Sequence, residues 1–318
     1  TLDQFPVPEK DGETRFHDFD LDLSLMRGIA EQGFQYCTPI QAEVLEHTLA
    51  GADAIGRAQT GTGKTAAFLV STITQLLETP PPDERFMGEP RALIIAPTRE
   101  LVMQIASDAE GLTKHCPLNV MTFVGGMDLD KQLKQLEQRY CDILVATPGR
   151  LLDFCNRGEV HLDLLEVLVL DEADRMLDMG FAEDMERLCK ECENREQTLL
   201  FSATTGGAAL RDIIGKVLKD PEHLMLNSVS QLAEGTRQQI ITADHDQHKE
   251  QIAQWLLANE TFDKAIIFTN TRAMADRIYG HLVAKDVKAF VLHGEKDQKD
   301  RKLAIERFKQ GSSKVLVA

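Results

Sequence analysis

The sequence predicts an α/β protein with two parallel-sheet domains in tandem. Short apolar segments, such as 91–96 and 143–146, alternate with longer helix-like segments, and this alternation is typical of a parallel sheet covered by helices on both faces. Residues 227–236 have no sustained apolar period, and a second alternation follows them. At 318 residues the chain is long enough for two domains. We therefore expect a tail, a first domain, a linker and a second domain at residues 1–15, 16–226, 227–236 and 237–318.

The elements of the first domain follow from local patterns. Helices are expected at 24–32, from Pro39 onward and at 64–77, because Pro39 suits a first helical turn and the other stretches lack breakers. The proline-rich run 79–90 is expected to be an exposed, mobile loop. Strands are expected at short apolar runs: 52–55, 91–96, 119–124, 143–146, 167–170, 198–201 and 221–225.

The second domain repeats the alternation without a glycine–lysine loop of its own. Its expected strands are 237–243, 264–269, 289–292 and 314–318, and its expected helices are 247–259, 271–285 and 297–310.

Composition limits the classes of function. Hydrophobic residues make up 43% and charged residues 27% of the chain, as in ordinary globular proteins. No apolar run approaches the roughly 20 residues of a membrane helix, and the polar N-terminus does not suit a signal or transit peptide. The six cysteines include one Cys-x-x-Cys, Cys189 to Cys192, without a second pair, so we expect reduced thiols and a cytoplasmic protein without a membrane partner.

The net charge of −16 argues against nucleic-acid binding by bulk electrostatics. It leaves room for a local phosphate-binding surface made of backbone amides and a few arginines.

The segment Ala58–Thr65 carries the strongest signal. It lies between a predicted strand and a predicted helix, where small residues and glycines let backbone N–H groups point at one polyphosphate. Lys64 would reach the β- and γ-phosphates, and the Thr65 hydroxyl would hold Mg²⁺. The sequence therefore predicts a nucleoside triphosphate site that comprises Ala58, Gln59, Thr60, Gly61, Thr62, Gly63, Lys64 and Thr65.

Base recognition must come from outside this loop, because a phosphate loop does not distinguish adenine from guanine. The Gln41 carboxamide donates and accepts hydrogen bonds at once, which suits the edge of adenine. Phe16 offers an aromatic ring that can stack on a base. These two residues favour ATP as the nucleotide.

An acidic segment follows the apolar run 167–170. A buried strand that ends in an acid is how phosphate-loop enzymes present a carboxylate to Mg²⁺, so Asp171 is the predicted second metal ligand. Glu172 is placed to orient or deprotonate the attacking water. The hydroxyls of Ser202 and Thr204, after the next strand, are expected to bond to Asp174 and to link hydrolysis to movement.

Three other strands end in groups that suit phosphate contacts. Ligands bind beyond the carboxyl ends of parallel strands, and hydroxyls, glycines and arginines there favour a nucleic-acid backbone. The candidate contacts are Pro97, Thr98, Arg99, Gly125, Gly126, Thr147, Pro148, Gly149 and Arg150.

These segments, in this order, make the chain similar to the DEAD-box RNA helicases, in particular to bacterial members, from Phe16 onward. Phe16 with residues 33–41 resembles the family's adenine-recognising Q motif, and residues 58–65 resemble its motif I. Asp171–Asp174 is the tetrapeptide that names the family, and Ser202–Thr204 resembles motif III. Residues 97–101, 125–126 and 147–150 match RNA-facing motifs of the first domain.

The resemblance implies two RecA-like domains that clamp RNA when ATP and Mg²⁺ bridge them. In the second domain, residues 266–271 resemble motif IV, which implies RNA contacts from Thr269, Asn270 and Thr271. Gln298 and Arg301 occupy the places of a further polar pair. The implied activity is RNA-stimulated ATP hydrolysis with local strand separation, and the implied partners are RNA, RNA-processing proteins and ribosome-assembly proteins.

The chain departs from the family's pattern in one respect. After residues 315–318, members of the family continue with motifs V and VI, which this sequence does not contain. The resemblance therefore implies an incomplete second RecA-like domain and weak turnover by this chain. Two alternatives stay open at this point. One is a phosphate-loop motor that acts on DNA or protein, and the other is an RNA-binding clamp or scaffold without strong turnover.

Overall fold

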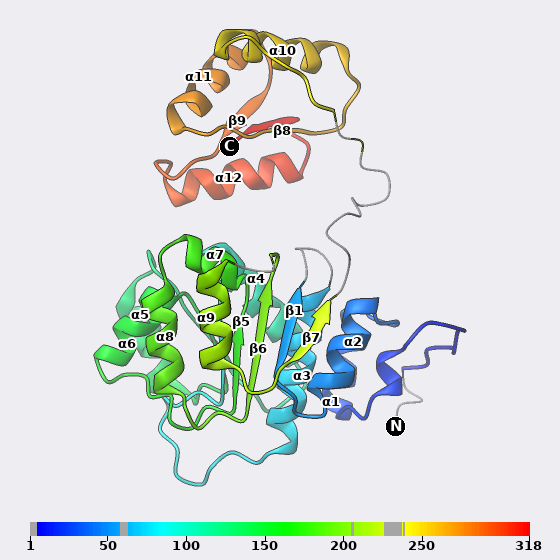
Figure 1. The fold of residues 1–318 in the computed structure, drawn as a ribbon, viewed down its shortest axis with the longest axis vertical. Coiled ribbons are helices and arrows are strands. Elements are labelled where there is room, and N and C mark those ends of the chain that lie inside the picture. The colour runs from blue at the N-terminus through cyan, green and yellow to red at the C-terminus, as the bar shows by residue number, and fades with distance from the viewer. Residues whose placement is uncertain (1–4, 58–62, 205–206, 226–236, 238) are drawn as a thin grey trace. The chain divides into compact units, whose positions relative to one another are not determined.

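The computed structural model describes residues 5–57, 63–204, 207–225, 237 and 239–318. The chain forms two compact units, Thr1–Glu234 and Gly235–Ala318 (Figure 1). Each unit contains a parallel sheet with helices, so the predicted α/β class with two parallel-sheet domains is confirmed.

The first unit contains a seven-stranded parallel sheet with the strand order β3-β4-β2-β5-β6-β1-β7. Because all strands run the same way, their carboxyl ends lie at one edge of the sheet. The strands are β1 (Ala54–Arg57), β2 (Ala92–Ile95), β3 (Val120–Phe123), β4 (Ile143–Ala146), β5 (Val167–Leu170), β6 (Gln197–Ser202) and β7 (Glu222–Met225).

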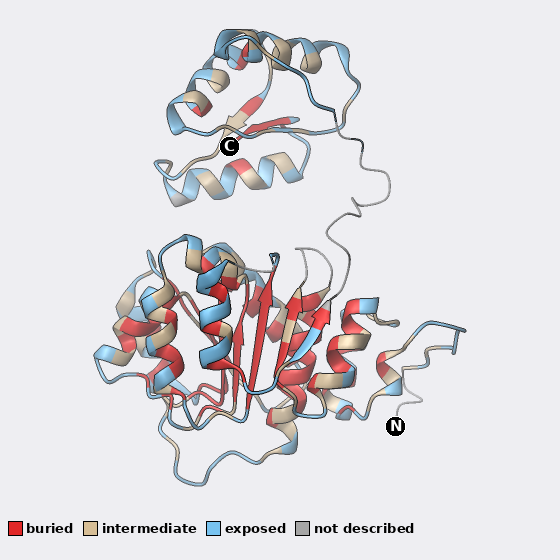
Figure 2. Cartoon of the chain, in the orientation of Figure 1, coloured by how far each residue is buried: buried red, intermediate tan, exposed pale blue. Residues whose placement is uncertain are grey.

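Helices cover both faces of this sheet. Successive side chains of a strand point to opposite faces, so Ile94 packs in one core cluster and Ile95 in the other. Figure 2 shows the sheet buried between the helical layers. One layer contains the short 3₁₀ helix Phe16–Asp18 with α1 (Leu23–Glu31), α2 (Pro39–Thr48), α3 (Lys64–Glu78) and α4 (Arg99–Leu112). The other contains α5 (Leu129–Gln138), α6 (Pro148–Asn156), α7 (Ala173–Asp178), α8 (Ala182–Glu191) and α9 (Ala208–Val217).

The second unit has a smaller parallel sheet with the order β8-β10-β9. Figure 1 shows α10 and α11 on one face of it and α12 on the other. One core cluster among the described residues of this unit contains Ala275, Leu282, Ala289, Val315 and Val317, and Ala304 and Leu316 are buried as well. The elements are α10 (Asp246–Asn259), β8 (Ala265–Ile267), α11 (Arg272–Val283), β9 (Ala289–Val291), α12 (Gln298–Lys309) and β10 (Val315–Val317).

One predicted strand is wrong. The described residues of 237–243 form neither a strand nor a helix. Ile240 is 96% exposed, so its side chain contributes nothing to a core. A β-branched run becomes a strand only where it packs against a neighbour, and these residues lack one in the described chain.

No helix among the described residues is long and apolar enough to span a lipid bilayer.

Candidate functional site

The described part of the predicted phosphate loop is Gly63, Lys64 and Thr65, at the start of α3, the helix that follows β1 in the chain. Gly63 caps α3 with a φ of +87°, a conformation that favours glycine. A Cβ atom on Gly63 would lie 2.7 Å from the Nε2 of Gln41. Lys64 and Thr65 then begin the helix. The rest of the predicted loop, Ala58, Gln59, Thr60, Gly61 and Thr62, lies outside the described residues.

Lys64 and Asp171 form a buried ion pair at the carboxyl edge of the sheet. The Lys64 Nζ lies 2.8 Å from the Asp171 Oδ1, and the two side chains are 7% and 0% exposed. Burial raises the pKa of Asp171, while the Lys64 ammonium and the Glu172 backbone N–H oppose that rise. Because β1 and β5 both flank β6 in the sheet, the pair brings the phosphate loop after β1 and the acidic segment after β5 together across the end of β6.

The second oxygen of Asp171 is available to a cation. Its Oδ2 is buried and has no hydrogen-bond partner within the described residues. A carboxylate oxygen is a donor that Mg²⁺ prefers, and the partly exposed Thr65 lies in the first turn of the helix that Lys64 begins. The donor set therefore fits the magnesium ion that the sequence predicts.

Glu172 adopts a left-handed backbone conformation, with φ of 50°, just before α7. Its N–H donates to the Asp171 Oδ1 at 2.9 Å, and its Oε2 pairs with the Arg175 Nη1 at 3.0 Å. Non-glycine residues rarely occupy this conformation, and such residues cluster at functional sites. The geometry holds the Glu172 carboxylate partly exposed beside the buried Asp171.

Asp174 contacts the Ser202–Thr204 segment through a backbone amide. The Thr204 N–H donates to the Asp174 Oδ2 at 3.1 Å, and the Ser202 Oγ donates to the Thr204 carbonyl at 3.0 Å. The expected hydroxyl contacts to Asp174 are therefore replaced by a main-chain contact. The predicted connection between the two segments is present, with different donor atoms.

Gln41 lies beside the phosphate loop, whereas Phe16 lies in the core. The Gln41 Nε2 donates to the Gly63 carbonyl at 3.2 Å, and its Oε1 accepts the Thr38 N–H at 2.9 Å. Phe16 is 0% exposed and stacks on Phe34 with ring centroids 6.1 Å apart. The expectation that Phe16 stacks on a base is corrected here, because its ring is buried against other side chains. Phe34, within the segment 33–41 that resembles the Q motif, is partly exposed and packs against the core.

The predicted RNA-facing segments of the first unit gather at the ends of β2, β3 and β4, which are neighbours in the sheet. The Arg99 Nη1 lies 3.6 Å from the position that a Cβ atom on Gly126 would take. The Arg150 Nη1 donates to the Met127 carbonyl at 3.5 Å. Among the remaining candidates, Gly125 and Gly149 are exposed, Thr98 and Thr147 are partly exposed, and Pro97 and Pro148 are buried.

The two buried prolines, Pro97 and Pro148, do not offer a surface to RNA in this structure. The prediction that they contact RNA is therefore corrected, and their role is to support the local backbone. Pro148 begins α6, where a fixed φ suits the first turn. Thr98 caps α4 by accepting the Leu101 N–H at 3.3 Å. Arg99 and Arg150 follow these residues in the first turns of α4 and α6.

In the second unit, Thr269, Asn270 and Thr271 line a cavity of about 390 Å³ between β8, α10 and α11. The Thr271 hydroxyl caps α11 by accepting the Met274 N–H at 3.2 Å. The Thr269 Oγ1 lies 3.0 Å from the Thr271 carbonyl, and Asn270 is exposed. These residues therefore form an accessible loop at the carboxyl end of β8.

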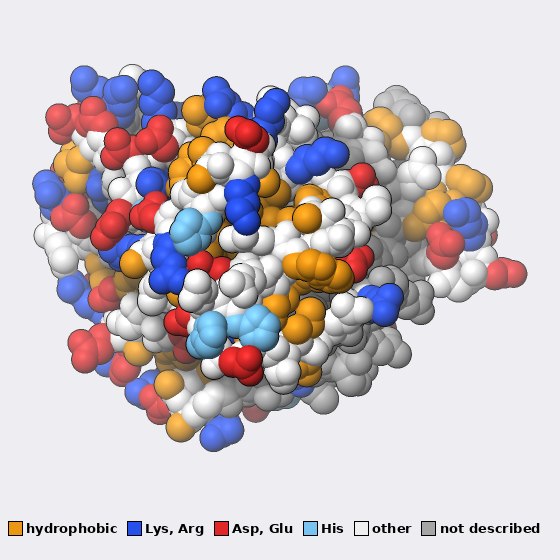
Figure 3. Space-filling model, turned by 90° about the horizontal axis from the view of Figure 1, so that it is seen from above, with side chains coloured by type: hydrophobic (Ala, Val, Ile, Leu, Met, Phe, Trp, Pro, Cys, Tyr) orange, Lys and Arg blue, Asp and Glu red, His pale blue; other side chains and the backbone are white. Residues whose placement is uncertain are grey.

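Charges of both signs share the face of the molecule that Figure 3 shows. Its lysines and arginines are interspersed with acidic side chains. The view shows side chains of both charges together rather than one extended basic surface.

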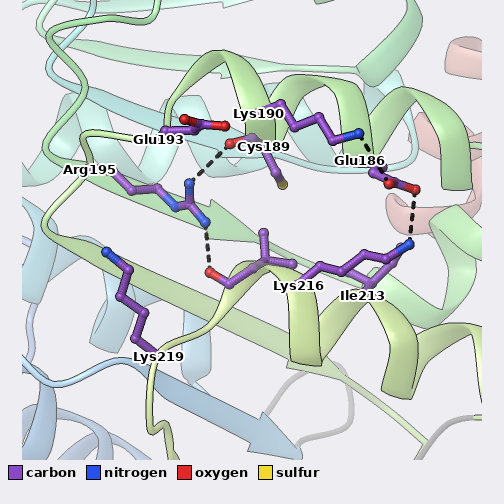
Figure 4. A pocket seen from close by; sticks show the side chains of 9 residues that line it. Glu186, Cys189, Lys190, Glu193, Arg195, Ile213, Lys216 and Lys219 are labelled. Carbon is purple, nitrogen blue, oxygen red and sulfur yellow. Dashed lines mark hydrogen bonds and ion pairs between the residues drawn. The ribbon is translucent and has the colours of Figure 1, made fainter.

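A second cavity, of about 490 Å³, lies between α8 and α9 (Figure 4). Two of its lysines are partnered, since Glu186 pairs with Lys190 at 3.4 Å and with Lys216 at 3.3 Å. Arg195 donates to the carbonyls of Cys189, at 3.1 Å, and Val217, at 2.7 Å. Arg195 thus satisfies carbonyl groups near the C-terminal ends of α8 and α9. The lining of this cavity does not resemble a nucleotide site.

A lysine at the start of the helix after β1, paired with an acid at the end of β5 and followed by a second parallel-sheet unit, is typical of a nucleotide-dependent helicase. Residues 38–213 match the DEAD/DEAH box helicase family, and residues 247–318 match the helicase conserved C-terminal domain. The chain belongs to the DEAD/DEAH box helicase family.

Similar proteins agree with this assignment. The chain is 54% identical over 314 residues to the ATP-dependent RNA helicase RhlB of Pseudomonas aeruginosa, covering 98% of this chain and 79% of the relative. It is 54% identical to RhlB of Pseudomonas syringae pv. tomato, covering 97% and 78%. Among solved structures, S. cerevisiae Dbp5 bound to RNA and ADP BeF3 is similar with a TM-score of 0.81 and 28% identity, covering 96% of this chain and 75% of that chain. This structural match confirms the predicted RecA-like fold of the two units.

Proposed function

We propose that this protein is an ATP-dependent RNA helicase that couples ATP binding and hydrolysis to RNA binding and local strand separation. The observation that carries the proposal is the buried pair of Lys64 and Asp171 at the carboxyl edge of the sheet. The proposal is also supported by the similarity of almost the whole chain to RNA helicases named RhlB. That similarity favours an enzyme over the alternative of a scaffold without turnover.

In the proposed mechanism, ATP separates the Lys64–Asp171 pair. Lys64 turns to the phosphates, and Asp171 and the Thr65 hydroxyl would hold Mg²⁺, which would neutralise charge on the phosphates. Glu172 orients the attacking water and takes its proton, and its pairing with Arg175 sets the direction of its carboxylate. Gln41 recognises adenine from its place beside Gly63.

RNA binds through its backbone in this proposal. In the first unit the contacts are Thr98, Arg99, Gly125, Gly126, Thr147, Gly149 and Arg150, and in the second they are Thr269, Asn270 and Thr271. Backbone contacts give weak sequence preference. They also fit a chain with a net charge of −16, because they need few cations. We place the protein in the cytoplasm, with RNA-processing or ribosome-assembly proteins as partners.

The test is ATP hydrolysis with saturating RNA, with DNA of the same sequence and with no nucleic acid. The proposal expects stimulation by RNA alone. Equal rates in all three conditions would refute it, and equal stimulation by DNA would favour a motor that acts on DNA. Glu172→Gln is the control for contaminating activity, since it removes the proposed base.

A further inference from the structure

A buried glutamine of α5, Gln132, holds the loop between β3 and α5 from within. Its side chain is 2% exposed. Its Oε1 accepts the Val124 N–H at 2.9 Å. Its Nε2 lies 3.4 Å from the carbonyl of Val124, 3.5 Å from that of Met127 and 3.3 Å from that of Asp128. One carboxamide therefore bonds to both ends of the loop 124–128.

A leucine would be the ordinary residue on the buried face of this helix, as Leu136 is one turn later. A buried amide is costly unless its donors and acceptor are satisfied, so Gln132 is stable only when the loop offers its backbone groups in this arrangement. The glutamine and the loop conformation therefore stabilise each other.

The loop lies where the three proposed RNA-binding segments of the first unit meet. It contains Gly125 and Gly126, and Gly126 has a φ of +73° that favours glycine. Arg150 donates to the Met127 carbonyl within the loop, and the Arg99 guanidinium lies beside Gly126. A change in the loop would consequently move the glycines and both arginine contacts together.

We propose that Gln132 is a positioning residue for RNA binding, because its buried carboxamide fixes the loop that joins the three RNA-binding segments. This inference rests on the function proposed above. Without the carboxamide, the loop would adopt its binding conformation only part of the time, and the apparent affinity for RNA would fall by that fraction. The nucleotide site, after β1 and β5, would be unaffected.

The test uses the full chain with two substitutions. Gln132→Glu keeps an acceptor for the Val124 N–H but turns a carboxylate toward three carbonyl oxygens. Gln132→Met removes every side-chain hydrogen bond of this residue without adding charge. We expect RNA affinity to fall by about 10-fold in both variants, as the loss of buried hydrogen bonds predicts. The affinity for a fluorescent ADP derivative should stay within about twofold, because the side-chain hydrogen bonds of Gln132 within the described residues go to the loop 124–128.

The matched control is Gln197→Glu. Gln197 is 1% exposed, and its Nε2 donates to the carbonyls of Thr48 at 2.9 Å and Ala52 at 2.7 Å. It begins β6, at the edge of the sheet opposite the binding loops. We expect Gln197→Glu and Gln132→Glu both to lower the unfolding temperature. Only Gln132→Glu should also lower the RNA affinity.

RNA affinity is measured by the fluorescence anisotropy of a labelled single-stranded oligouridylate in the presence of ADP and beryllium fluoride. If the unsubstituted protein binds this RNA and both Gln132 variants match it, the positioning role is overturned and the proposed function stands. If the variants lose ADP binding along with RNA binding, Gln132 serves folding, and the positioning role is again overturned. If the unsubstituted protein binds no RNA, the proposed function fails and the inference fails with it.

Discussion

The buried pair of Lys64 and Asp171 offers a quantitative prediction about the protein without nucleotide. Lys64→Met replaces the ammonium by an apolar chain of similar length and leaves the Asp171 carboxylate unpaired at 0% exposure. Removal of one partner of a buried ion pair costs about 3–5 kcal/mol. The Glu172 N–H still donates to Asp171, at 2.9 Å, so we expect a loss near the lower end, about 3 kcal/mol.

The double substitution Lys64→Met with Asp171→Asn should recover most of this loss. The introduced carboxamide would be neutral, and its oxygen would still accept the Glu172 N–H. Asp171→Asn alone should cost less than Lys64→Met alone, because the flexible Lys64 stem can carry its ammonium toward water. The two single effects should therefore be strongly non-additive.

The assay is urea unfolding followed by circular dichroism, with an expected midpoint shift of about 1 M or more for Lys64→Met. Trp255, the one tryptophan of the chain, lies in α10, so its fluorescence reports on the second unit and should not shift. Single effects that add to within about 0.5 kcal/mol would refute the reasoning, because independent sites behave in that way.

Three further outcomes are expected. Gln41→Ala should erase much of a preference for ATP over GTP, worth about 1–3 kcal/mol for a paired contact to a base, and equal affinities in the unsubstituted protein would contradict this. Glu172→Gln should bind ATP normally and lower RNA-stimulated turnover by about 10²–10⁴-fold, and an unchanged rate would remove Glu172 from the chemistry. Lys114 and His115 lower the pKa of Glu31 to about 2, so the stability from this contact is present above the unfolded pKa of about 4.5 and is lost as the pH falls. The difference in unfolding midpoint between the unsubstituted protein and Glu31→Gln should shrink between about pH 5 and pH 3, and a constant difference would contradict the contact.

Much of the fold follows from the sequence because apolar periods and strand ends are local signals. The run 167–170 and the acid after it became β5 and a buried carboxylate, as expected. The strand β1 begins two residues later than predicted, at Ala54, and the buried Asp53 before it accepts the N–H of Thr198 with its carboxylate at 2.7 Å. The strand predicted at 237–243 is wrong, because a strand also needs a neighbouring strand, which a local sequence pattern does not reveal.

Tertiary contacts set the parts of the site that the sequence did not reveal. Phe16 is an aromatic residue near a predicted base site, and only packing against Phe34 shows that its ring lies in the core. Gln132 is one polar residue in a helix rich in polar residues, and its burial depends on the path of the loop before it. Arg85 lies in a proline-rich run expected to be exposed, yet its guanidinium pairs with Asp142 at 2.9 Å.

The most direct test of the helicase proposal is the affinity of the full chain for single-stranded RNA with ADP and beryllium fluoride, compared with ADP alone. If nucleotide and RNA sites are coupled, the ATP analogue should tighten RNA binding by about 5–150-fold, and RNA should tighten binding of the analogue by the same factor. DNA of the same sequence should show a smaller effect. An RNA affinity that is the same with both nucleotides would contradict the coupling on which the proposed function rests.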